Sequence, residues 1–161
     1  MTAAPALTRL HAHEMASRLR QGELSSRELV EAHLDVAERE NRALNAWLTI
    51  DRDTALAQAD AADARLAAAR AEGDHAVRAL HPLLGIPVAL KDLISVEGGQ
   101  CTAGSRILEG YIAPYDAHIT ERLRDAGWRI DPPVSVPIAH GASPAATAAA
   151  DPPLEPPGTR S

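Results

Sequence analysis

Apolar positions recur every three or four residues over the first part of the chain. Residues 9–21 show this spacing and stop before Gly22, which predicts a helix. A second helix is predicted over residues 26–41, because Ser25 and Glu28 have the spacing of a capping box. In such a box the serine hydroxyl accepts a first-turn N–H and the glutamate side chain reaches back to the cap.

In the segments that follow, the spacing of the apolar residues changes twice. Residues 46–50, AWLTI, are short, apolar and partly β-branched, which favours a strand. Residues 52–72 are rich in alanine and are followed by Gly73, which predicts a helix and its end. Residues 73–82 form a polar connection in this interpretation. The first part of the chain, residues 9–80, is therefore predicted to consist of packed helices.

From residue 81 the pattern becomes that of an α/β protein. Residues 85–92, GIPVALKD, are predicted to form a buried strand. A loop rich in Gly, Ser and Thr follows over residues 97–105, and residues 105–111 form a short helical or irregular piece. A last helix is predicted from Asp116, its cap, toward Gly127. Strand, loop and helix in this order begin an α/β core.

The C-terminal residues 128–161 differ in composition from everything before them. They hold eight of the twelve prolines, together with many alanines. Proline interrupts both helix and strand, and this composition offers little apolar surface to bury. We therefore predict a disordered tail, which is either genuine or the product of a shifted reading frame.

Composition narrows the classes of function. The 161 residues carry a formal net charge of −6, so the sequence has no basic footprint for direct nucleic-acid binding. The single cysteine excludes an internal disulfide framework and fits a reducing compartment. No apolar run has the length of a signal peptide core or a membrane span. We expect a cytoplasmic protein that makes no membrane contact.

Lys91 is the only lysine, beside fifteen arginines. In a structural interpretation its side chain reaches solvent or pairs with a carboxylate such as Asp92. In a chemical interpretation the side chain is buried, the ammonium form is disfavoured, and the neutral amine acts as a base. An arginine cannot do this, because its guanidinium stays charged. The residues alone leave both interpretations open.

A longer stretch resembles a known family. Residues 83–127, LLGIPVALKDLISVEGGQCTAGSRILEGYIAPYDAHITERLRDAG, resemble the amidase signature family, in which LxGIPxxLKD is the first catalytic block. TAGSRILEGY followed by PYDA is more similar to the A subunits of glutamyl-tRNA(Gln) amidotransferases than to general amidases. The opening helices and the short strand, residues 25–51, also fit. The resemblance covers residues 7–127, the N-terminal part of an amidase domain.

The resemblance implies a fold, a reaction and partners. The fold is α/β: N-terminal helices lead into the first part of a mixed sheet flanked by helices. A Ser–cis-Ser–Lys triad hydrolyses amides in this family, and Lys91 matches its lysine. The A subunit releases ammonia from glutamine, which a B subunit uses to convert Glu-tRNA(Gln) to Gln-tRNA(Gln), while a small C subunit braces the pair. ATP and Mg²⁺ belong to the B subunit, so the resemblance implies no cofactor and no metal in this chain.

The chain departs from the family after Gly127. The glycine- and serine-rich segment that carries the bridging serine and the nucleophile does not follow. Ser135, Ser143 and Ser161 lack its glycine-rich frame, and Ser105 is interpreted as a loop residue near the pocket. We therefore expect a truncated chain, by frameshift or as a real short product, that holds only the catalytic lysine and is inactive alone.

Two alternatives stay open at this point. One is the same part of a general amidase that acts on small amides, because the substrate residues lie downstream. The other is a non-catalytic module whose helical face binds partner subunits.

Overall fold

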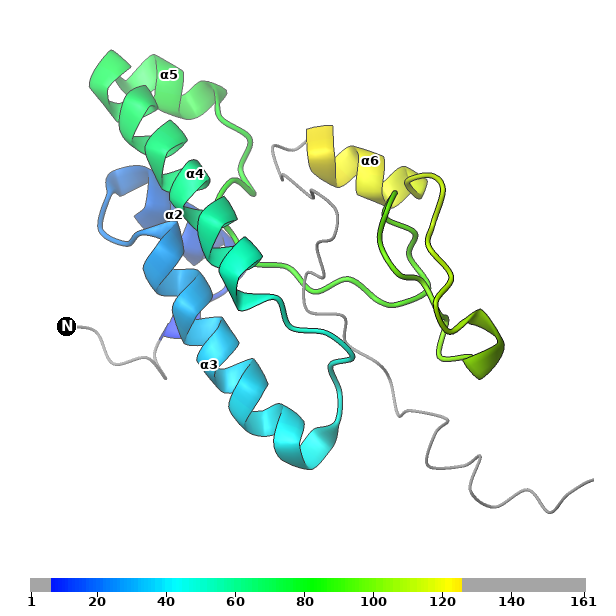
Figure 1. Ribbon diagram of the computed structural model, residues 1–161. Coiled ribbons are helices and arrows are strands. Elements are labelled where there is room, and N and C mark those ends of the chain that lie inside the picture. The colour runs from blue at the N-terminus through cyan, green and yellow to red at the C-terminus, as the bar shows by residue number, and fades with distance from the viewer. Residues whose placement is uncertain (1–6, 126–161) are drawn as a thin grey trace, which may run out of the picture.

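The computed structural model describes residues 7–125, and two lobes are distinguishable in it (Figure 1). The named elements are, in order, α2 (Ala12–Gln21), α3 (Ser26–Leu44), α4 (Arg52–Glu72), α5 (Asp74–Ala79), the 3₁₀ helix η1 (Arg106–Leu108) and α6 (His118–Asp125). Residues 7–86, which contain α2 to α5, are called the helical lobe. Residues 87–125, which contain η1 and α6, are called the loop lobe. In Figure 1, α3 and α4 lie side by side, and an extended link leads from α5 to the loop lobe.

The start of α3 is held by two sets of acceptors. The predicted capping box is confirmed: the Glu28 N–H donates to Ser25 Oγ at 3.1 Å, and the Ser25 N–H donates to Glu28 Oε2 at 3.0 Å. The carboxylate of Asp63 on α4 accepts the next two free N–H groups, from Ser26 at 2.7 Å and from Arg27 at 3.0 Å. The first three N–H groups of α3 therefore have partners, which fixes this end of the helix against α4.

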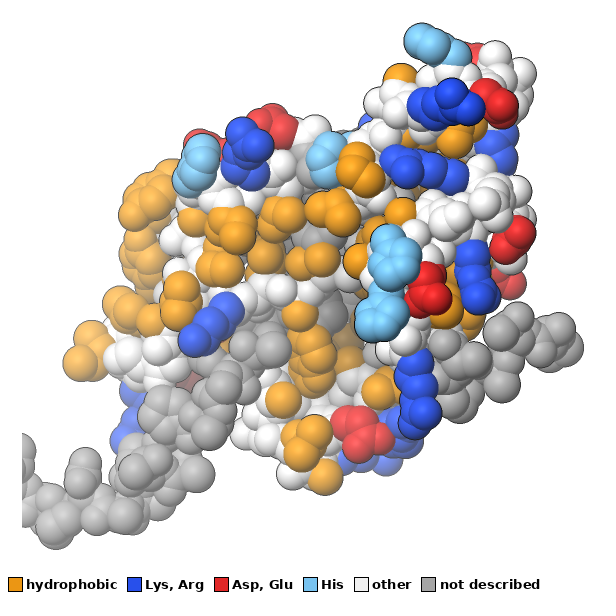
Figure 2. Space-filling view, turned by 180° about the vertical axis from the view of Figure 1, so that it is seen from behind, with side chains coloured by type: hydrophobic (Ala, Val, Ile, Leu, Met, Phe, Trp, Pro, Cys, Tyr) orange, Lys and Arg blue, Asp and Glu red, His pale blue; other side chains and the backbone are white. Residues whose placement is uncertain are grey.

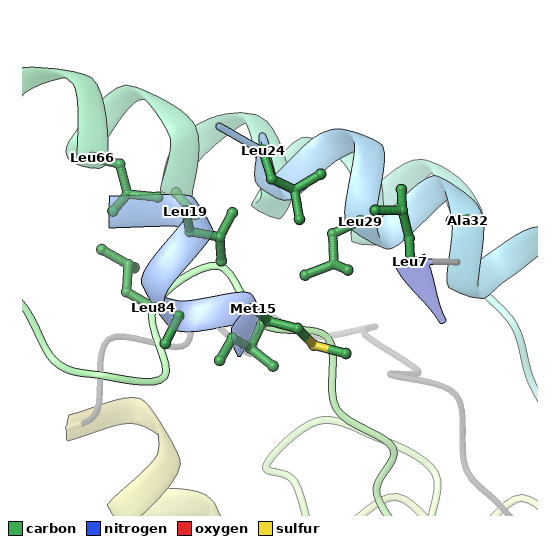
Figure 3. Packing of buried hydrophobic residues seen from close by; sticks show 11 residues of the cluster. Leu7, Met15, Leu19, Leu24, Leu29, Ala32, Leu66 and Leu84 are labelled. Carbon is green, nitrogen blue, oxygen red and sulfur yellow. The ribbon is translucent and has the colours of Figure 1, made fainter. Parts of the chain in front are cut away.

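The core of the helical lobe lies between α2, α3 and α4 (Figure 3). Leu29 is 0 % exposed, and Leu19 and Leu66 are almost as deeply buried. The link after α5 joins this core through two further residues, Leu84 and Ile86. Burial of large aliphatic side chains stabilises a small lobe by about 1.5–3 kcal/mol each, so these contacts outweigh the capping bonds.

The predicted helix over 52–72 is confirmed, and the helix predicted over 26–41 extends three residues further to Leu44. The first helix also forms, although it begins at Ala12. Residues 73–82 were expected to be a plain connection, and this is wrong, since α5 occupies part of them. Its six residues bury no side chain, so the apolar pattern gave no signal.

Both predicted strands are wrong for the described part of the chain. Residues 46–50 and 85–92 form no named strand, and the bridge in the loop lobe between Gln100 and Ile112 is isolated. A strand is stabilised by the ladder to its neighbour, and no neighbouring strand lies beside residues 85–92 within the range 7–125. The expected α/β architecture is thus present only as its helical portion, and the segment that carries Lys91 is extended but unpaired.

Asp116 does not cap the last helix. α6 begins at His118, and the Asp116 carboxylate accepts the Glu97 N–H at 2.7 Å and pairs with Arg124 Nε at 2.8 Å. The side chain therefore ties the loop before η1 to α6 and leaves the helix start to other groups. The predicted short helical piece after residue 105 is confirmed as η1.

The predicted tail over residues 128–161 lies outside the described residues. No helix within residues 7–125 is long and apolar enough to cross a membrane. Apolar side chains gather over the face of the loop lobe that Figure 2 shows from behind. The large apolar residues exposed in this lobe are Leu93, Ile107, Leu108, Tyr111, Ile112, Tyr115 and Ile119.

Candidate functional site

The link that leads to Lys91 is fixed to the helical lobe. The guanidinium of Arg20 donates to the Leu80 carbonyl at 3.1 Å, and Ser26 Oγ donates to the Gly85 carbonyl at 2.8 Å. Gly85 has φ +81°, and a Cβ there would lie 3.2 Å from the Ser26 side chain. The backbone passes so close to α3 that a residue without a side chain is required at this point.

Beyond the link, side chains alternate between the two sides of an extended backbone. Leu90 is 5 % exposed, Lys91 is exposed, and Asp92 is 2 % exposed. This period of two is that of a β-strand, although no ladder is formed. Leu90 packs with Val96 in the core of the loop lobe. Lys91 is therefore held between two buried neighbours, and its own side chain faces outward.

The structure places Lys91 in solvent, unlike the buried lysine that the chemical interpretation requires. None of the described residues forms a hydrogen bond or an ion pair with its amine. The pairing with Asp92 that the structural interpretation suggested is therefore also not seen within residues 7–125. Contacts from outside the described residues would have to supply any desolvation of this amine.

Asp92 is the best-connected side chain of the site. Its carboxylate accepts the Thr102 N–H at 2.9 Å, the Gly104 N–H at 3.1 Å and the Thr102 hydroxyl. Its main-chain carbonyl accepts the Ala103 N–H at 3.3 Å and the Cys101 thiol at 3.1 Å. One residue thus binds the TAGS segment of the predicted loop from both its side chain and its backbone.

Short backbone contacts complete the loop between residues 98 and 113. The Gly98 N–H donates to the Ala113 carbonyl at 2.8 Å, and the Ala113 N–H donates to the Gly99 carbonyl at 2.9 Å. Ser105 Oγ accepts the Ile107 N–H at 3.3 Å and so caps η1. The Ser105 hydroxyl is thereby used in the local structure of the loop.

A hollow of about 940 Å³ separates this loop from the connection between α3 and α4. Its lining includes Asp51 and Arg52 on one side and Gly99, Gln100 and Thr102 on the other. Asp92 contributes to the lining, whereas Lys91 does not. The lysine and the hollow therefore lie on different sides of the same short backbone segment.

The histidines of the N-terminal helix are not arranged as metal ligands. The rings of His11 and His13 stack with centroids 5.7 Å apart. Two residues that are two apart within a helix point in different directions, but His11 lies at the N-cap, outside the helical turns. Within the described range, no group of three His, Cys, Asp or Glu residues could hold a metal ion.

Comparison with known proteins decides the family. The profile of the family described as Amidase matches residues 28–130, which is more than half of the chain and includes Lys91, Asp92 and the TAGS loop. The chain belongs to the amidase family. Among curated proteins, it is 44 % identical over 121 residues to the A subunit of the glutamyl-tRNA(Gln) amidotransferase of Acidothermus cellulolyticus, and 47 % identical over 114 residues to that of Azoarcus sp..

This amidase-family chain spans only about a fifth of the length of those relatives. The matches cover 75 % and 71 % of the chain but 22 % of each relative. Among solved structures, a fatty acid amide hydrolase is similar with a TM-score of 0.67 at 25 % identity, covering 78 % of this chain and 21 % of that one. A chain of a vestigial protein complex related to the origins of an s-triazine catabolic enzyme gives 0.61 at 32 % identity, covering 73 % and 24 %.

Sequence reasoning singled out Lys91 in this amidase segment and missed the organising role of Asp92. A signal was present, since a loop of small residues leaves several backbone N–H groups without partners, and a nearby carboxylate is a strong acceptor for them. The ten-residue separation between Asp92 and Thr102 hid this pairing from local patterns.

Proposed function

We propose that residues 7–127 are the lysine-bearing part of an amidase domain and that Lys91 is the base of its catalytic triad. The observation that carries the proposal is the position of Lys91. It is the lysine of the LxGIPxxLKD block in a family-matched segment, on a backbone whose neighbours on both sides, Leu90 and Asp92, are buried. The rest of the lobe positions this backbone and leaves the amine uncommitted to the described residues.

The chemistry follows from the properties of a neutral amine. Lys91 accepts a proton through the bridging serine, and the second serine then attacks the amide carbonyl to form an acyl-enzyme and ammonia. Water resolves the acyl-enzyme in the second half of the reaction. Both serines belong to the family's signature segment, which has no counterpart in this sequence. The 161-residue chain alone is therefore inactive in this proposal.

The substrate proposed is the side-chain amide of glutamine. The support is the similarity to A subunits from several bacteria, each matched over a comparable segment. In such an assembly the released ammonia reaches a B subunit, which holds ATP and Mg²⁺ and amidates Glu-tRNA(Gln). A small C subunit braces the other two subunits. These partners belong to the complete amidotransferase.

The runner-up is the same part of a general amidase for small amides. The structural similarity to fatty acid amide hydrolase supports an amide substrate other than glutamine without identifying it. A third function is that of a binding module without catalysis, which would use the helical lobe to contact partner subunits. The three functions differ in their substrate and in whether they need Lys91.

A chimera tests the proposal. Residues 7–127 replace the matching segment of the Acidothermus cellulolyticus relative, which is produced with its B and C subunits. We expect ammonia release from glutamine and little release from a small aliphatic amide. Release from the small amide alone would favour the runner-up, and assembly with the B and C subunits without any hydrolysis would favour the binding module. If the 161-residue chain alone showed glutaminase activity that is lost in Lys91→Ala, this would contradict the proposal that the chain supplies the lysine but not the two serines.

A further inference from the structure

We infer that Asp92 is a positioning residue for Lys91: its buried side chain fills an anion site made by the TAGS loop and so fixes the backbone from which the lysine projects. This inference rests on the proposed function for its catalytic meaning. Its structural content can be tested without any activity. Asp92 does not touch the reacting atoms in this account and acts through its neighbour.

The loop offers three consecutive backbone N–H groups to one residue. The Thr102 and Gly104 N–H groups donate to the two carboxylate oxygens of Asp92, at 2.9 and 3.1 Å, and the Ala103 N–H between them donates to its carbonyl at 3.3 Å. Two of the three N–H groups therefore converge on the carboxylate, and backbone N–H groups that converge in a loop form a concave site for an anion. Here the anion is built into the chain, at the residue that follows Lys91.

The loop backbone needs this partner. Ala103 has φ 48° and Gly104 has φ 72°, so two successive residues lie in the left-handed region. A non-glycine residue in this region is held there at a cost that surrounding contacts must offset. The bonds that Asp92 accepts offset this cost, and the Thr102 hydroxyl is a further donor to the same carboxylate. Thr102 Oγ1 also accepts the Gly104 N–H at 3.2 Å. Without them, we expect the loop to relax.

Relaxation of the loop would reach Lys91 directly. Consecutive Cα atoms are about 3.8 Å apart, so a fixed Asp92 leaves the Lys91 Cα little freedom. Leu90 is fixed on the other side by its packing with Val96. A displacement of a catalytic group by about 1 Å can slow the reaction about 100-fold. The anchors on both sides of Lys91 therefore matter for catalysis.

Both oxygens of the Asp92 carboxylate are in use, and this makes the asparagine variant informative. Oδ1 accepts from the Thr102 N–H, whereas Oδ2 accepts from the Gly104 N–H and the Thr102 hydroxyl. An asparagine has the same shape but only one acceptor oxygen, and its amino group would face a donor. Asp92→Asn therefore removes the anion while leaving the volume unchanged.

The single lysine makes the test specific. When the 161-residue chain is labelled with ¹⁵N-lysine, its NMR spectrum contains one backbone amide signal, that of Lys91. We expect a backbone order parameter of about 0.85 in the wild type and below about 0.6 in Asp92→Asn. Thr102→Val removes the hydroxyl and should lower the order parameter by less than Asp92→Asn does. Thr102→Ser keeps the hydroxyl and should leave the order parameter at the wild-type value.

Asp63→Asn is the matched control. Asp63 also accepts two backbone N–H groups through its two carboxylate oxygens, but it does so at the start of α3 in the helical lobe. Its loss should reduce stability and leave the Lys91 order parameter unchanged. Circular dichroism of the helices shows whether each variant keeps its helical lobe. If Asp92→Asn fails to fold, the comparison of Thr102→Val with Thr102→Ser still tests whether the Asp92 contacts order Lys91.

Two results would overturn the inference. One is a Lys91 order parameter that is as high in Asp92→Asn and Thr102→Val as in the wild type. The other is a decrease of this order parameter in Asp63→Asn that equals the decrease in Asp92→Asn. Failure of the proposed function gives a different pattern. In that case the order parameters change as expected, while the chimera releases no ammonia from any amide.

Discussion

The helical lobe and the loop lobe are stabilised in different ways. In the helical lobe, large aliphatic side chains from α2, α3 and α4 meet in one core, and Leu29 is 0 % exposed. In the loop lobe the buried cluster is small, while Ile107 is 93 % exposed and Tyr115 is 63 % exposed. Polar side chains bound to backbone groups, above all Asp92, determine the course of its loops.

The difference has a functional meaning. A lobe with a closed apolar core is stable through its own packing, whereas an apolar face of the kind seen on the loop lobe is typical of surfaces that contact other protein. Lys91 lies on the loop lobe, close to the boundary between the two. The helical lobe therefore acts as the support, and the loop lobe carries the candidate chemistry. The predictions below test how each lobe is stabilised.

The largest effect is expected in the core of the helical lobe. Leu29→Ala removes a fully buried side chain from α3 and should lower the free energy of unfolding by about 2–5 kcal/mol. Leu44→Ala lies at the other end of the same helix, where the side chain is 68 % exposed, and should change it by less than about 0.5 kcal/mol. Urea unfolding followed by circular dichroism measures both. Equal effects would show that the proposed core does not stabilise the lobe.

Two glycines with the same backbone angle compare the lobes directly. Gly85 and Gly110 both have φ +81°, but an added Cβ would crowd Ser26 at Gly85 and would meet nothing within 4 Å at Gly110. Gly110→Ala should cost about 1 kcal/mol from backbone strain, and Gly85→Ala about 1–3 kcal/mol more from overpacking. Thermal unfolding checks the order. A larger loss at Gly110 would contradict the close contact between the link and α3.

The caps give a smaller contrast. Ser25→Ala removes the hydroxyl that accepts the Glu28 N–H and should destabilise α3 by about 1 kcal/mol. Ser105 caps the three-residue helix η1 in the loop lobe, so Ser105→Ala should leave the helical unfolding transition unchanged. Chemical denaturation of both variants measures the difference. If Ser105→Ala shifts the main transition as much as Ser25→Ala, the lobes are not energetically separate.

The smallest effect concerns pH. The Glu28 carboxylate accepts the Ser25 N–H, which lowers its pKa from the usual value of 4.5. Because the folded-state pKa is the lower one, this contribution is present above the unfolded-state value and is lost as the pH falls through the folded-state value. Glu28 is solvent-exposed, so the effect should stay below about 1 kcal/mol. Stability measured between pH 7 and pH 3 should fall less in Glu28→Gln than in the wild type. An identical pH dependence of the two proteins would contradict this role.

The helical lobe was largely predictable from the sequence because its signals are local. The Ser25–Glu28 capping box marked the start of α3, and Gly73 marked the end of α4. These signals lie within one or two helical turns of the structure they determine. The short helix α5 was missed, because it buries no side chain and so has no apolar pattern.

The loop lobe was less predictable because its contacts are distant in sequence. The apolar run over residues 85–92 suggested a strand, but a strand also needs a partner that the local pattern cannot specify. Asp116 has the character of a helix cap, yet it binds Glu97 and Arg124 instead. The family resemblance identified Lys91, whereas the role of Asp92 became visible only when Thr102 and Gly104 were placed against it.

The most direct test of the account is the rate of ammonia release from glutamine by the chimera with Lys91→Arg. Arginine keeps the positive charge but cannot accept a proton, so we predict a loss of about 10²–10⁴-fold in kcat with the fold intact. Arg78→Lys on the exposed side of α5 makes the opposite exchange away from the site and should leave the rate unchanged. A Lys91→Arg chimera that retains the full glutaminase rate would contradict the assignment of Lys91 as the catalytic base.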